Sequence, residues 1–172
     1  MTADTTSEKN ERDDILEALA AHRGFLRRTV RDLTDEQAAM RPTVSELCLG
    51  GIIKHVTAVE RAWADFVRRG PVAMAFTPER AASHAAGFRM EPGDTLAGLL
   101  DDYEAAARET DELVVSAASL DESQPLPEAP WFPPGARRSV RRVMVHLVAE
   151  TAQHAGHADI IRESIDGAKT MG

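Results

Sequence analysis

Helical periodicity dominates this chain and limits the folds open to it. Apolar residues recur every three or four positions in four separate segments, which is the pattern of amphipathic helices. The segments run from Asp13 to Leu33, from about Val44 or Ser45 to Arg69, from Thr95 to about Ala118, and from Val140 to Asp166. No stretch shows the convincing alternation of a half-buried strand. The sequence therefore predicts an all-α protein, a four-helix bundle.

Turn and cap residues suggest where these helices begin and end. Thr43 and Glu46 fit a capping box for the second helix, Asp94 is a candidate N-cap for the third, and Ser139 is one for the fourth. Residues 121–136 contain five prolines, so we expect neither helix nor central strand there. The 23-residue connection 71–93, after helix two, is long enough to cross the bundle.

Length and charge narrow the class of protein. The 172 residues fit one domain, with residues 1–10 predicted as a flexible N-terminal tail. Twenty basic and 28 acidic residues give a net charge of −8, which argues against binding nucleic acid or acidic membranes. We see no signal peptide and no segment long and apolar enough to span a membrane. The single cysteine, Cys48, is interpreted as a small buried residue. These observations predict a cytoplasmic protein.

The fourth helix carries a pair of side chains suited to a metal ion. Glu150 and His154 are four residues apart, so both lie on one face of the helix. His55, flanked by apolar residues midway along the second helix, could supply a third ligand from a neighbouring helix. Two imidazoles and one carboxylate suit Zn²⁺ in a catalytic role as well as Fe²⁺ or Ni²⁺, whereas a lone histidine on an apolar face is more often a structural residue.

Other polar and aromatic residues flank this group. His146 lies too far around the helix from His154 to bind the same cation, and we expect it to contact the ligands without binding the metal. His157 could replace either Glu150 or His154 as a ligand. Trp63, two turns after His55, packs in the core or forms a pocket wall. Four arginines at the start of the fourth helix form a solvated surface or a cradle for an anionic substrate or thiol, and we place Arg141 among the substrate candidates: Arg137, Arg138, Arg141 and Arg142.

Two segments together resemble a known superfamily. LGGIIKHVTAVERAW, followed about ninety residues later by SVRRVMVHLVAETAQHAGHADIIRESIDG, is similar to the DinB superfamily, particularly its actinobacterial branch. The resemblance implies a DinB-like bundle in which His55, Glu150 and His154 hold a divalent metal. Many relatives have His where this chain has Glu150, but the related mycothiol-dependent maleylpyruvate isomerases use two His and one Glu at a zinc site. His157 stands where relatives have Gln, which places it outside the ligand set.

The resemblance also implies a chemistry. It suggests a metal-dependent thiol transferase or isomerase that uses a small thiol such as mycothiol on an electrophile, with a homodimer as one possible assembly. A metal-dependent hydrolase and a non-enzymatic stress or binding protein are the alternatives, so whether the chain is an enzyme is left open. The sequence contains no nucleophile elbow, phosphate loop or dinucleotide fingerprint that would favour another reaction. It does not identify the electrophile.

Overall fold

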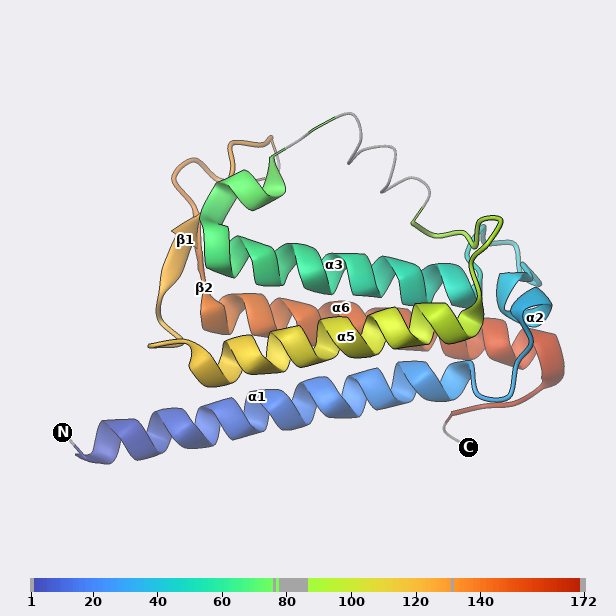
Figure 1. Ribbon diagram of the computed structural model, residues 1–172, viewed down its shortest axis with the longest axis horizontal. Coiled ribbons are helices and arrows are strands. Elements are labelled where there is room, and N and C mark those ends of the chain that lie inside the picture. Colours follow the sequence, from blue (N-terminus) through green and yellow to red (C-terminus); the bar gives the residue numbers. More distant parts are fainter. Residues whose placement is uncertain (1, 76, 78–86, 131, 171–172) are drawn as a thin grey trace.

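The computed structural model describes residues 2–75, 77, 87–130 and 132–170, and it is an all-α bundle (Figure 1). Four long helices form it: α1 (Thr2–Thr29), α3 (Leu49–Arg69), α5 (Leu96–Ser116) and α6 (Val140–Asp166). The short helix α2 (Asp35–Ala39) and the 3-10 helix η1 (Gly70–Met74) lie in connections. Two three-residue strands, β1 (Ser123–Pro125) and β2 (Arg137–Ser139), pair antiparallel. The predicted fold class is confirmed.

Ion pairs show how the helices run relative to one another. Arg61 with Asp102 and Arg68 with Glu109 join α3 to α5 at one constant sequence offset, so these two helices are parallel. Arg23 with Asp111 and Arg27 with Glu104 show that α1 and α5 are antiparallel. The connection between α3 and α5 therefore crosses back along the bundle, as its length allowed (Figure 1). Its residues 78–86 lie outside the described part of the chain.

The interior consists of two apolar clusters along the bundle axis. One lies around Leu26, Ile52 and Tyr103, and the other around Phe66 and Met144. Burying such side chains contributes roughly 1.5–3 kcal/mol each, which is the main source of stability for the bundle. None of the described helices combines the length and apolarity needed to cross a bilayer.

Two helix starts differ from the sequence-based prediction. The capping box at Thr43 is wrong: its hydroxyl accepts a hydrogen bond from the Ser45 amide instead, and α3 begins only at Leu49. Cys48 is the N-cap, with its buried sulfur accepting from the Gly51 amide at 3.4 Å. For α5 the cap is Thr95, not Asp94. In both places the side chain of the expected cap accepts a hydrogen bond from a nearby backbone amide in a local turn, Ser45 for Thr43 and Glu91 for Asp94, instead of capping the helix.

Two further regions differ in secondary structure. The backbone from Thr2 onward is helical and belongs to α1, where a flexible tail over residues 1–10 was expected. The segment holds no proline or glycine, so an established helix can propagate through it. β1 lies near the start of the proline-rich stretch, and β2 begins directly after this stretch. Proline is tolerated there because both strands are short edge strands, whereas a central strand does not tolerate it. The Ser139 cap of α6 is confirmed by its hydrogen bond to the Arg142 amide at 3.1 Å.

A notch at the start of α3 receives the chain that returns from the crossing connection. A Cβ atom on Gly51 would lie 2.0 Å from the Phe88 carbonyl oxygen, and one on Gly50 would lie 2.3 Å from the Met90 sulfur. Only glycine permits the approach of two backbones at Gly51, whereas the neighbour of Gly50 is the flexible Met90 side chain. Gly51 thus lets the backbone of Phe88 lie against α3, one turn before His55.

Candidate metal centre

The antiparallel helices α3 and α6 bring together the three residues singled out in the sequence. The Nε2 atom of His55 lies 3.1 Å from Oε1 of Glu150, and the Nε2 atom of His154 lies 3.3 Å from the same oxygen. All three candidate ligand atoms fall within 4.8 Å of one another. Within the described residues, this is the group of His, Cys, Asp and Glu side chains with the geometry to hold a metal ion.

The group is mostly shielded from solvent. The side chains of His55 and His154 are 7% and 11% exposed, and that of Glu150 is 21% exposed. Hydrogen bonds from His154 and then His55 hold the pKa of Glu150 well below its ordinary value, outweighing the opposite effect of burial. Glu150 is therefore an anion at neutral pH, with two ring nitrogens directed at it.

Phe88 forms a wall of the group that the sequence did not indicate. Its ring stacks on His55 with the centroids 4.0 Å apart and the planes inclined by 22°. The same ring lies 5.9 Å from that of His154. Phe88 reaches this position because Gly51, which has no side chain, lets the Phe88 backbone lie close to α3. The contact joins segments that are distant in the sequence, so no local pattern indicates it.

His157 contacts the His154 ring on the side that faces away from Glu150. Its Nδ1 atom lies 3.5 Å from Nδ1 of His154, on the opposite side of that ring from the Nε2 that faces Glu150. His157 therefore contacts the candidate ligand His154 but does not belong to the group of His55, Glu150 and His154. Such a contact helps to fix the orientation and tautomer of a histidine ligand.

The remaining flanking candidates lie along the helices towards the start of α6. The Trp63 ring is almost fully buried and meets the His146 ring edge-on at 4.9 Å. Burial and the nearby Arg138 lower the pKa of His146, so it is neutral at pH 7. The guanidinium of Arg141, the residue that we placed among the substrate candidates, forms ion pairs with Glu11 and Asp121 at the end of the bundle. It joins α1 to α6 and does not face the group.

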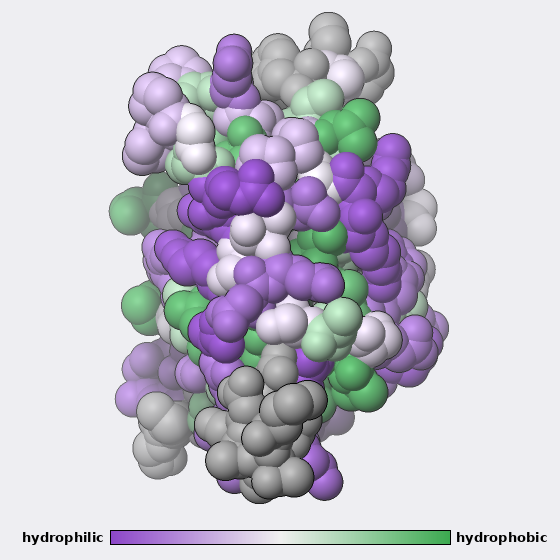
Figure 2. All heavy atoms as spheres, turned by 90° about the vertical axis from the view of Figure 1, so that its left-hand side faces the viewer, coloured by the Kyte–Doolittle hydropathy of each residue, from purple (hydrophilic) through white to green (hydrophobic). Residues whose placement is uncertain are grey.

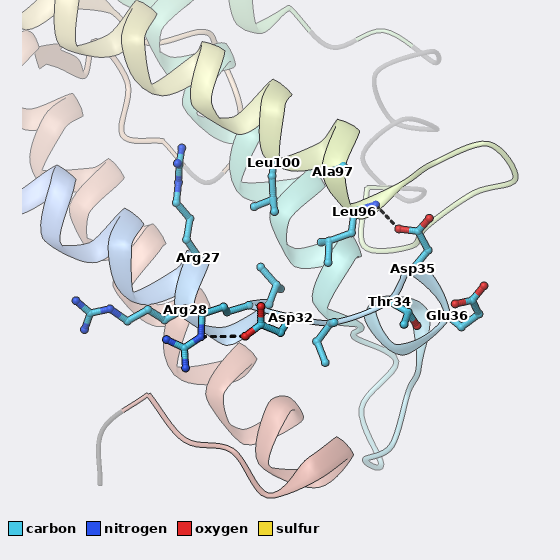
Figure 3. A pocket seen from close by; sticks show the side chains of 12 residues that line it. Arg27, Arg28, Asp32, Thr34, Asp35, Glu36, Leu96, Ala97 and Leu100 are labelled. Carbon is cyan, nitrogen blue, oxygen red and sulfur yellow. Dashed lines mark hydrogen bonds and ion pairs between the residues drawn. The ribbon is translucent and has the colours of Figure 1, made fainter.

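A spacious hollow lies elsewhere, where α1 ends. It encloses about 810 Å³ between the last turn of α1, the turn into α2 and the start of α5 (Figure 3). Its arginines are partly engaged, since Arg27 pairs with Glu104 and Arg31 with Asp32. None of the converging residues His55, Glu150 and His154 lines it.

Comparison with known proteins decides the family. Residues 14–167 match the family model described as mycothiol-S-transferase. The chain belongs to the mycothiol-S-transferase family. The match confirms the relationship inferred from the segments around His55 and Glu150, and it covers α1 from Asp14 onward and the whole of α3, α5 and α6.

One solved structure shares the fold. It is titled "Crystal structure of the conserved protein of locus from Enterococcus faecalis", with a TM-score of 0.62 and 14% sequence identity over 91% of this chain and 97% of that one. At this identity the likeness concerns the fold alone. No curated protein sequence matches the chain significantly.

Proposed function

We propose that this protein is a metal-dependent transferase that joins the sulfur of mycothiol to a small electrophile. The observation that carries the proposal is the convergence of two imidazole nitrogens on one carboxylate oxygen, at 3.1 and 3.3 Å, in a chain of the mycothiol-S-transferase family. Family membership supports the thiol and the transfer, and the geometry supports the metal.

The residues present fit a divalent cation. Two neutral imidazoles and one anionic carboxylate are the donor set of many catalytic zinc sites, which leave a further position for an exogenous ligand. A cation bound by His55, Glu150 and His154 would lower the pKa of a coordinated thiol, so that the thiolate prevails near neutral pH. Zn²⁺ is our first choice, ahead of Fe²⁺ and Ni²⁺.

The side chains around the group support this use. His157 contacts Nδ1 of His154, which leaves Nε2 of that ring facing Glu150. Phe88 covers one face of His55 and keeps water from it, which strengthens electrostatic interactions nearby. The anionic Glu150 carries no proton that would have to leave before it binds a cation.

The nucleophile has to come from a second molecule. Cys48 is 1% exposed, and its sulfur caps α3, so this thiol is occupied as a structural group. We infer that the thiolate of mycothiol attacks the electrophilic carbon: a carbon–sulfur bond forms, and the leaving group departs with its bonding electrons. The thiol proton passes to solvent.

Elemental analysis of protein purified without an affinity tag and without added metal tests the metal. We expect about one divalent ion per chain and its loss in His154→Ala. His22→Ala is the matched control, because His22 lies on α1 with its ring edge-on to Phe25, and it should keep the metal. Metal content that is absent, or unchanged in His154→Ala, would contradict the proposal.

The requirement for the thiol tests the reaction. Product formation from a haloacetamide electrophile should depend on mycothiol and fall to the uncatalysed rate after chelation. A hydrolase using the same ion would release product without added thiol. A non-enzymatic protein would give no product in either case, and Glu150→Gln would then change only stability.

A further inference from the structure

A row of side chains leads from the group at Glu150 to the beginning of α6. Arg138, in β2, holds its guanidinium carbon 4.5 Å from the centre of the Trp63 ring. Trp63 in turn lies 4.9 Å from the His146 ring, and His146 precedes Glu150 by one helical turn. Figure 2 looks onto this end of the bundle, whose surface is largely hydrophilic. We call Arg138, Trp63 and His146 the arginine row.

The positive charge in this row lacks a counter-charge. Within the described part of the chain, Arg138 and its neighbour Arg142 form no ion pair, whereas Arg141 between them binds both Glu11 and Asp121. Burial, and then repulsion from Arg142, lower the pKa of Arg138. Among the described residues, two guanidinium groups thus lie close together without an ion pair, in a chain with a net charge of −8.

One donor of Arg138 is also unsatisfied. Its Nη1 atom is buried and has no hydrogen-bond partner among the described residues. The Trp63 ring interacts with the face of the guanidinium, but the N–H donors point along the edge of that plane and need acceptor oxygens. Leaving a buried donor without an acceptor costs about 1–3 kcal/mol. An anion with oxygen acceptors beside the guanidinium would compensate its charge.

The structure has room for such a group. Arg138 lines a cavity of about 240 Å³ together with polar side chains of β1 and apolar residues of α3 and α6. Glu122 lines it too, but no ion pair joins Glu122 to Arg138. The Ser123 hydroxyl accepts from Arg137 and can donate its own proton to a further oxygen, and the Gln124 amide, which donates to the Val67 carbonyl at 3.4 Å, has a second N–H.

We propose that Arg138, assisted by Arg142, binds a carboxylate on the electrophilic substrate and so selects acids that carry this group on an arm extending away from the reacting carbon. The inference rests on the proposed thiol transfer for its biological meaning. The anion site itself can be measured without metal, thiol or turnover.

Tryptophan fluorescence tests the anion site directly. Trp131→Phe leaves Trp63 as the remaining tryptophan, and the protein is titrated with 6-acetamidohexanoate, with 6-acetamidohexanamide as the uncharged counterpart. We expect a saturable signal with the acid alone, weakened about tenfold or more by Arg138→Met, as the loss of a charged hydrogen bond implies. Arg138→Lys, which keeps the charge, should bind with intermediate affinity.

Arg137→Met is the matched control. Arg137 is adjacent and equally charged, but its guanidinium binds the Ser123 hydroxyl and carbonyl at 3.0 and 2.6 Å and does not touch Trp63. This variant should bind the acid within twofold of the parent. No saturable signal with the acid, an equal response to the amide, or undiminished binding by Arg138→Met would overturn the inference.

Turnover tests the consequence for the substrate. With mycothiol, 6-(iodoacetamido)hexanoate and its amide differ only in the charge at the far end of the arm; the sulfur–carbon bond forms while iodide leaves with the bonding electrons. In Arg138→Met we expect KM for the acid to rise about tenfold, with kcat and the amide reaction within twofold. Equal losses for acid and amide would refute selection of acids. If the parent protein accelerates neither reaction, the proposed transfer fails, and the fluorescence titration still decides on Arg138.

Discussion

The buried ion pair between Arg23 and Glu60 offers a sharp test of how this bundle is stabilised. Arg23 on α1 binds Glu60 on α3 and also Asp111 on α5, at 2.8 Å. The side chains of Arg23 and Glu60 are 6% and 2% exposed, but that of Asp111 is 44% exposed. The same cation therefore has one partner deep in the core and one at the surface.

We expect Glu60→Gln to destabilise the fold far more than Asp111→Asn. Removing one member of a buried pair costs about 3–5 kcal/mol, since the other charge stays buried without full compensation. The amide of Gln still accepts a hydrogen bond, which places the expected loss near the lower end of that range. Water can replace much of the interaction of Asp111, so that variant should lose about 1 kcal/mol or less.

Urea unfolding followed by circular dichroism measures both losses, and thermal unfolding should show a fall of roughly 6–12 °C for Glu60→Gln. Replacing both members, as Arg23→Met with Glu60→Leu, should cost less than Glu60→Gln alone, because no unpaired charge is then buried. Equal losses for Glu60→Gln and Asp111→Asn would refute the assignment of the stabilisation to burial.

Three further predictions concern α3 and α6. Gly156 is helical and exposed, and a Cβ atom added there would meet nothing within 4 Å, so Gly156→Ala should raise the free energy of unfolding by about 1 kcal/mol in urea titration. Gly51→Ala should lower it by about 1–3 kcal/mol in the same titration, since the new methyl would overlap the Phe88 carbonyl. The folded-state pKa of His146 is lowered, so the unfolded chain binds more protons as pH falls through about 6.5, and stability decreases there; His146→Gln should show a flatter decrease between about pH 7 and 5.

The fold could be predicted largely because its helices have strong periodic patterns. The bounds of α6 agree with the sequence, since a serine cap and Gly167, which has a positive φ of 80°, mark its two ends. The start of α3 could not be predicted as well. Thr43 has the residue type and spacing of a cap, but its hydroxyl closes a local turn, while Cys48, a weak acceptor, occupies the capping position.

The candidate site was predictable where helical spacing determines it. Glu150 and His154 share a face because they are four residues apart. His55 was a candidate from its apolar neighbours on the second helix, and the family resemblance supported it. The roles of the arginines could not be told apart from sequence, because the engagement of Arg141 depends on Glu11, 130 residues away. Phe88 was missed for the same reason, since its place on His55 arises from a contact between distant segments.

The converging residues all come from the helices α3 and α6, whereas the cavity beside Arg138 takes its polar side chains from β1, β2 and Glu122, and only Val67 and Val140 from α3 and α6. Under the proposed function, the residues that would hold the metal and the polar side chains that would select a substrate lie in different parts of the chain. Substitutions in and around β1 and β2 would then change which electrophile is accepted and leave the spacing of His55, Glu150 and His154 intact. A lineage built on this bundle would diversify its substrates without rebuilding the candidate metal centre.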